Sequence, residues 1–171
     1  MPVTAHPWPL LSALLALGCP PSQALDDSGE PAVACPSSWA AGEDGVWLQP
    51  HACLGWSPRS DEPMDWYAAA SPESAVAGGC SAHCAEEPGW CDSLAGLGGI
   101  ARWRLPSIEE LQVAAETEPP LTPLDGYLWS RDTCAQMEDM AWQIELDNPL
   151  LQSAAGKDQD GWARCVADLA R

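Results

Sequence analysis

The chain has little positive charge and few histidines. Among its 171 residues are seven Lys and Arg, three His and 25 Asp and Glu, which give a formal net charge of −18. Such a surface repels phosphate backbones, anionic lipid and sulfated polyanions, so the sequence predicts no nucleic-acid partner and no direct membrane binding. Only His51 and His83 follow the first two dozen residues. These two do not supply a nucleophile-base pair in a recognisable context or a histidine-rich iron site, so no catalytic residue is assigned.

Phenylalanine is absent and tyrosine occurs only at positions 67 and 127, whereas the chain has ten tryptophans. A tryptophan buries a large apolar area, yet its indole N–H needs a hydrogen-bond partner. The composition therefore favours a core role for most of the tryptophans. It leaves open that one or two of them stack on a sugar ring.

The chain also lacks a long apolar run. Residues 1–24 carry no charged side chain, and their apolar stretch from Leu10 to Leu17 is far shorter than the roughly 20 residues that a bilayer requires. This pattern predicts an export signal, cleaved after Ala24 or read as a lipoprotein signal with Cys19 acylated. A tether rich in Pro, Ser and acidic residues follows at 25–43, and a domain at 44–171. The expected location is the periplasm, the outer membrane (as a lipoprotein) or the exterior.

No C-x-x-C motif occurs among the eight cysteines, which lie at positions 19, 35, 53, 80, 84, 91, 134 and 165. In an exported protein this number favours disulfides. The alternative is a zinc site formed by Cys80, His83, Cys84 and Cys91. If Cys19 is removed or acylated, seven cysteines remain, so one of them is unpaired or bonded to another molecule. The residue pattern alone does not fix the pairing of the others.

The order of elements predicts an α+β domain. Strands are expected at 44–50 and 52–58, and helices within 64–80, where Pro72 interrupts, and near 89–96. Strands at 127–132, 140–148, 150–153 and 162–169 close the chain. Within 140–148 the alternation places Trp142, Ile144 and Leu146 on one face and Gln143, Glu145 and Asp147 on the other.

A strand-to-helix junction is predicted at "RWRLPSIEELQ", residues 102–112. Alternation suits a short strand at 102–105 that buries Trp103 and Leu105, and Pro106 ends it because proline has no N–H. Ser107 and Glu110 have the spacing of a capping box, so a helix should run from Ile108 to about Thr117. Leu105 and Leu111 flank the cap closely enough for a staple-like contact.

Several motifs together resemble the Lcl C-terminal domain family of exported bacterial proteins. They are "VWLQPHACLGW", "MDW", "WCDSLAGLGGIARWRLPSIEEL", "YLWS", "MAWQIELDN" and "WARCV", which span about residues 44–167. "WRLPSIEEL" and "RCV" are the most specific of these. The stretch 67–89 looks longer than is usual in the family.

The resemblance implies a compact fold like that of C-type lectins and formylglycine-generating-enzyme domains. It also implies a disulfide between Cys91 and Cys165. Cys53, Cys80, Cys84 and Cys134 have no counterpart in the family motifs, and the pairing of these four and of Cys35 is not implied. The residues that match the family's fold motif are Trp103, Arg104, Leu105, Pro106, Ser107, Glu110, Leu111, Trp129, Ser130, Trp142 and Arg164. Arg104 is expected to neutralise a nearby carboxylate or to bond backbone carbonyls, with ligand binding as the minor alternative.

The function expected from sequence is that of a noncatalytic envelope or surface module that binds a glycan or a protein. A structural envelope lipoprotein and a calcium-assisted lectin are the alternatives; the latter rests on fold analogy and on acidic residues near Asp147. No cofactor is assigned apart from this calcium alternative. A formylglycine-generating-enzyme-like activity is a minor alternative, because the longer motif set of those enzymes is missing.

Overall fold

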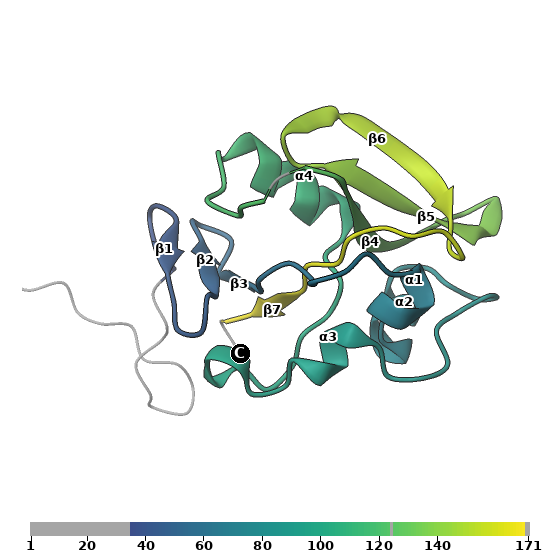
Figure 1. Cartoon of the computed structure of the whole chain (residues 1–171), viewed down its shortest axis with the longest axis horizontal. Coiled ribbons are helices and arrows are strands. Elements are labelled where there is room, and N and C mark those ends of the chain that lie inside the picture. Colours follow the sequence, from purple (N-terminus) through teal and green to yellow (C-terminus); the bar gives the residue numbers. More distant parts are fainter. Residues whose placement is uncertain (1–34, 124, 170–171) are drawn as a thin grey trace, which may run out of the picture. The chain divides into compact units, whose positions relative to one another are not determined.

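The computed structural model describes residues 35–123 and 125–169, which contain two antiparallel sheets (Figure 1). The first sheet has the order β1-β2-β3-β7, with β1 at Ala40–Ala41, β2 at Trp47–Gln49, β3 at Leu54–Trp56 and β7 at Val166–Asp168. The second has the order β4-β5-β6, with β4 at Tyr127–Cys134, β5 at Met137–Glu145 and β6 at Asn148–Gly156. The last strand of the described residues thus pairs with β3, one of the first.

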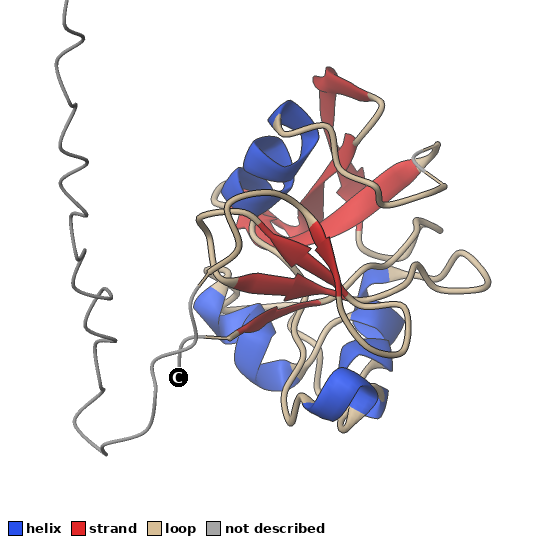
Figure 2. Cartoon of the chain, turned by 90° about the vertical axis from the view of Figure 1, so that its left-hand side faces the viewer, coloured by secondary structure: helices blue, strands red, loops and turns tan. Residues whose placement is uncertain are grey.

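Short helices complete the α+β fold that the sequence predicts (Figure 2). They are α1 at Trp66–Ala69, α2 at Pro72–Ala77, α3 at Trp90–Ser93, the 3-10 turn η1 at Leu97–Gly99 and α4 at Ile108–Glu116. Helix α4 packs against all three strands of the second sheet, while α2 packs against β4. Within the described part of the chain, no helix has the length and apolarity needed to cross a membrane.

Local signals place most of the helix starts. Ser107 caps α4, and the reciprocal bond from the Ser107 amide to Glu110 completes the predicted capping box. Pro72 does interrupt the helical stretch, but it also starts α2, because proline at the first helical position loses no hydrogen bond. Residues 35–43 were predicted to belong to the tether, but they contain β1, and Cys35 forms a disulfide with Cys53. Residues 1–34, with the predicted export signal and Cys19, lie outside the described residues.

The predicted strand at 102–105 is wrong. Trp103 and Leu105 are buried, as expected, but the segment forms a single antiparallel bridge, between Arg104 and Val166. Pro106 cannot donate to a further rung on one side of this bridge. On the other side no further bridge forms among the described residues, and the segment and β7 line a hollow.

The predicted facing of 140–148 is also wrong for Trp142. Ile144 and Leu146 are buried, whereas Trp142 keeps 37% of its surface exposed. The pairing of β4 with β5 shifts register between Trp129 and Thr133, and such an irregularity breaks the strict alternation of faces. Ala141 is therefore buried immediately before the exposed Trp142.

Four tryptophans are buried in the two hydrophobic clusters of the core, with Trp66, Trp103 and Trp129 in one and Trp56 in the other. Three of their indole N–H groups have partners, because Trp56 donates to Gln49 at 2.8 Å, Trp66 to the Ser130 carbonyl at 2.9 Å and Trp129 to the Met64 carbonyl at 3.0 Å. The predicted core role thus holds for these four. The indole of Trp103 is the exception, since its buried Nε1 has no partner among the described residues.

Candidate functional site

An open hollow of about 1110 Å³ lies where residues 99–104 separate from β7. Helix α2 and Asp92 of α3 form further walls, together with Arg131 of β4. The disulfide from Cys91 to Cys165 ties two of these walls together, because Cys91 precedes Asp92 and Cys165 precedes Val166. The hollow is therefore framed by covalently linked elements.

Arginines are concentrated in this hollow, next to an equal number of acidic residues. Three of the seven basic residues of the chain line it, namely Arg102, Arg104 and Arg131. Its acidic lining residues are Glu73, Asp92 and Asp168. In a chain with 25 acidic residues, such a gathering of arginines does not follow from composition.

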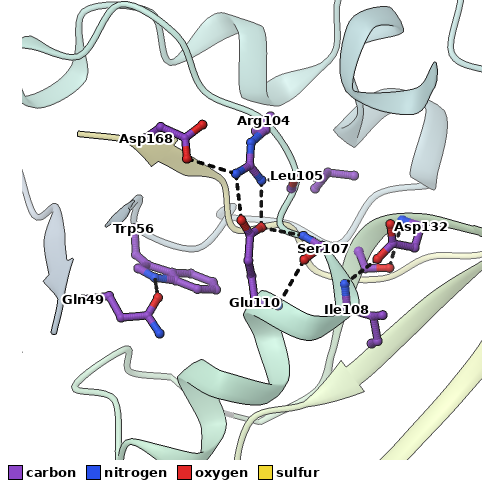
Figure 3. Close-up of polar contacts among 10 residues, drawn as sticks. Gln49, Trp56, Arg104, Leu105, Ser107, Ile108, Glu110, Asp132 and Asp168 are labelled. Carbon is purple, nitrogen blue, oxygen red and sulfur yellow. Dashed lines mark hydrogen bonds and ion pairs between the residues drawn. The ribbon is translucent and has the colours of Figure 1, made fainter. Parts of the chain in front are cut away.

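Arg104 is held in place by carboxylates (Figure 3). Its two terminal nitrogens donate to the two carboxylate oxygens of Glu110 at 2.7 Å each, and one of them lies 3.5 Å from Asp168. Burial alone lowers the pKa of Arg104, but the bonds to Glu110 outweigh it and the pKa lies above its ordinary value. This geometry has the form expected of a residue that neutralises a carboxylate, and it leaves Arg104 little capacity for a ligand.

The guanidinium groups of Arg102 and Arg131 have no bonded partner among the described residues, although the charge of Arg131 helps to lower the pKa of Glu110. Arg102 is exposed, and neither side chain makes a hydrogen bond or an ion pair within residues 35–123 and 125–169. The Nε of Arg131 and the Nε1 of Trp103 are buried without a partner in that same part of the chain. These two buried atoms are closed to solvent, so the groups that a ligand in the hollow could reach are the guanidinium ends of Arg102 and Arg131.

Backbone hydrogen bonds and close packing fix the position of the Arg131 main chain. Its amide donates to the Pro106 carbonyl at 2.8 Å, next to the cap of α4. The end of α2 packs directly on Arg131, because a Cβ atom at Gly78 would collide with the Arg131 carbonyl. The Gly78 carbonyl also accepts from the Thr133 amide at 3.0 Å. The main chain of Arg131 is thus held on two sides, while its guanidinium makes no hydrogen bond or ion pair with the described residues.

Replacing Glu110 with glutamine is expected to lower the free energy of unfolding by about 1–3 kcal/mol at pH 7. Burial raises the pKa of Glu110, but the hydrogen bonds from Arg104 and the Ser107 amide outweigh it, so the pKa lies below its ordinary value. The carboxylate therefore stabilises the fold fully above the ordinary glutamate pKa of about 4.3, and this stabilisation is lost as the pH falls through the folded-state pKa.

Urea unfolding of both proteins at several pH values measures the effect. The difference between wild type and Glu110→Gln should be largest at neutral pH and shrink below pH ~4. Glu109→Gln is the matched control, because Glu109 is exposed and occupies the same turn of α4. A difference that does not change with pH would show that the Glu110 carboxylate contributes no ionic stabilisation.

Most of the other predicted motif residues are buried in the core, and none of them lines the hollow. Leu105, Leu111, Trp129 and Ser130 are fully buried, as is Pro106, while Arg164 is 2% exposed. Cys91 and Cys165 are joined, which is the pairing that the family resemblance implies. Trp142 lies on β5 and does not line the hollow. Arg131 was missed by the sequence analysis, and Arg102 was given no role there; scarcity of positive charge was the signal that could have found them.

The zinc alternative is wrong for residues 80–91. Cys80 pairs with Cys84, and Cys91 pairs with Cys165, so these sulfurs are not free ligands. His83 contributes its carbonyl, which accepts from the buried Lys157 ammonium at 3.1 Å. In the residues that the structure describes, no three His, Cys, Asp or Glu side chains gather as a metal site would need.

Cys134 is the cysteine without a partner in the described part of the chain. It is 6% exposed, and burial raises the pKa of its thiol. A buried thiol of this kind is a poor nucleophile at neutral pH. Among the seven cysteines that follow residue 34, Cys134 is thus the odd one, and it is shielded from solvent.

Comparison of this chain with family models, with curated proteins and with solved structures gave no match. The resemblance to the Lcl C-terminal domain family and the C-type-lectin-like topology therefore stay predictions. What can be stated of the chain is an α+β fold with three disulfides and an arginine-lined hollow.

Proposed function

We propose that this protein is an exported, noncatalytic binding module whose ligand occupies the hollow beside Arg102 and Arg131. The observation that carries the proposal is the placement of these two unpaired guanidinium groups in one hollow of a chain with a net charge of −18. A guanidinium presents a planar fork of donors that matches a carboxylate or a similar anionic group. The ligand is a component of the cell surface or its surroundings, either a glycan or a protein.

The acidic surface shapes which ligands the hollow accepts. Glu73, Asp92 and Asp168 line the same space as the arginines, so a densely charged polyanion is repelled at short range as well as by the whole protein. A ligand with one anionic group and further polar groups fits better, because carboxylates accept hydrogen bonds from hydroxyl or amide donors. Binding is then set by short contacts and depends only moderately on salt.

Substitution of both free arginines tests the proposal. Arg102→Gln combined with Arg131→Gln is expected to weaken ligand binding by about 100-fold or more, because two charge-assisted bonds of roughly 1.5–3 kcal/mol each are lost. Binding is measured on glycan and peptide arrays with the oxidised domain, in calcium and again with chelator. Arg59→Gln is the control, since it removes the same charge at a position outside the hollow. Arg59 stacks on the ring of Trp162, and neither residue lines the hollow.

The outcomes separate the alternatives. A ligand whose binding is unchanged by the double substitution would refute the hollow as its site. Chelator-sensitive binding would support the calcium-assisted lectin instead. A blank result on folded protein would contradict the binding-module proposal and favour the structural lipoprotein, which incorporation of labelled fatty acid at Cys19 would then test.

A second candidate site is the open face of β5 around Trp142. Among the tryptophans of the described residues, Trp142 is the exposed one, with 37% of its surface accessible, and it pairs with the small Ala154 of β6. An exposed indole beside a small residue offers a flat surface on which a sugar ring can stack. Trp142→Ala should abolish binding of a neutral glycan at this face and leave binding in the hollow unchanged.

A further inference from the structure

The backbone at the hollow has an unfinished strand edge. Arg104 and Val166 exchange both backbone hydrogen bonds, at 3.0 and 2.8 Å. In an antiparallel ladder the next such pair lies two residues on, which here is Arg102 with Asp168. That pair is not formed among the described residues, because the two segments have separated around the hollow.

The free groups of Asp168 point toward the hollow. The Cys165 carbonyl accepts from the Ser57 amide at 2.9 Å, and the Leu169 amide donates to the Cys53 carbonyl at 2.9 Å. Residues 165, 167 and 169 therefore direct their backbone groups toward β3, and the alternation of the ladder directs those of 166 and 168 to the opposite side. Val166 uses its pair on Arg104, while the N–H and C=O of Asp168 have no backbone partner in the described part of the chain.

We infer that the ligand of the hollow is an extended peptide segment that ends in a free carboxylate; this inference rests on the proposed function. The peptide pairs one of its last residues with the N–H and C=O of Asp168, as a strand added to a sheet edge does. Its terminal carboxylate lies between the guanidinium groups of Arg102 and Arg131. A sugar acid would satisfy the arginines but has no backbone pair to offer the strand edge.

The charges of the hollow set a preference within this class. A chain terminus brings a single negative charge, which the two arginines can neutralise. Glu73 and Asp92 lie in the same lining, so acidic side chains next to the terminus are repelled and neutral or basic ones are favoured. The site therefore selects a free carboxyl end rather than an acidic stretch within a chain.

Arrays of random hexapeptides give a direct test with the full, oxidised protein. One array displays the peptides with a free carboxyl terminus and the other displays the same peptides as terminal amides. We expect binding on the first array and at least tenfold weaker signal on the second. Arg102→Gln with Arg131→Gln should reduce the first signal to the level of the second.

A substitution in the peptide tests the strand pairing without altering the protein. For the strongest hexapeptide, N-methylation is placed in turn at each of the last three amides. One of these should weaken binding by about tenfold or more, because it removes the donor to the sheet edge. N-methylation at the first amide is the matched control and should have little effect.

The results distinguish failure of the peptide-terminus inference from failure of the proposed binding function. Equal binding of acid and amide peptides, or no effect of N-methylation, would overturn the peptide-terminus inference. Binding of a glycan that is lost in the double arginine variant would also overturn it, yet would support the hollow as the binding site. Absence of both peptide and glycan binding on folded protein would contradict the proposed function itself.

Discussion

Replacing Arg164 with methionine is expected to lower the free energy of unfolding by about 3–5 kcal/mol, which is a large part of the roughly 5–15 kcal/mol that holds a domain of this size together. Arg164 is 2% exposed and donates to four backbone carbonyls. One of its terminal nitrogens bonds the Ser57 carbonyl at 3.1 Å, and the other bonds the Leu121 carbonyl at 2.9 Å. Methionine fills a similar volume but leaves these acceptors without donors.

The charge of Arg164 gives a second reason to expect a large loss of stability. Burial, together with the nearby charge of Arg59, lowers the pKa of Arg164 to about 10. The guanidinium is nevertheless charged at neutral pH, and no carboxylate among the described residues lies within ion-pair distance of it. The carbonyl groups are therefore what compensates the cost of burying the charge.

Urea unfolding at pH 7 measures the effect, and Arg164→Lys is the informative control. A lysine keeps the charge, but its compact ammonium cannot span the carbonyls on both sides as the planar guanidinium does. We expect Arg164→Lys to destabilise the protein nearly as much as methionine. Wild-type stability in the lysine variant would show that charge alone, rather than the fork of donors, secures this part of the fold.

The local signals in the sequence predicted the elements that they control directly. The capping box at Ser107 and Glu110 and the start of α4 are examples, because both depend on residues within one helical turn. Burial of Trp103 and Leu105 also followed from local alternation. The α+β class followed from the order of these elements along the chain.

Features that depend on distant partners could not be read in this way. The face of Trp142 is set by a register shift between β4 and β5, which no pattern within 140–148 records. The hollow exists because residues 99–104 leave β7 after a single bridge. That depends on contacts between segments far apart in sequence; Arg104 and Asp168, for example, are 64 positions apart. Arg131 joins the site from a third element, so its role appeared only in the structure.

Replacing both Cys91 and Cys165 with alanine is expected to lower the free energy of unfolding by about 4 kcal/mol. The two cysteines are 74 positions apart and both are fully buried. A crosslink that closes so long a loop removes much of the freedom of the unfolded chain, and the entropic cost grows with the logarithm of loop length. Alanine is chosen because it adds no buried polar group.

The short disulfide of the same domain supplies the matched control. Cys80 and Cys84 are only four positions apart, so their replacement by alanine should cost about 2 kcal/mol on the same argument. Urea unfolding of the two double variants under non-reducing conditions gives the comparison. Equal losses would show that loop entropy does not set the contribution of these bonds and that local packing does.

The long disulfide also connects stability to the proposed site. Because Cys91 and Cys165 adjoin Asp92 and Val166 in two walls of the hollow, loss of the bond frees those walls to move apart. The Cys91→Ala, Cys165→Ala variant should therefore bind the strongest carboxyl-terminal hexapeptide more weakly than wild type at a temperature where both are folded, because more freedom must then be lost on binding. The Cys80→Ala, Cys84→Ala variant should retain wild-type affinity, since neither of its cysteines lines the hollow. Equal affinity in all three proteins would mean that the walls hold their positions through packing alone.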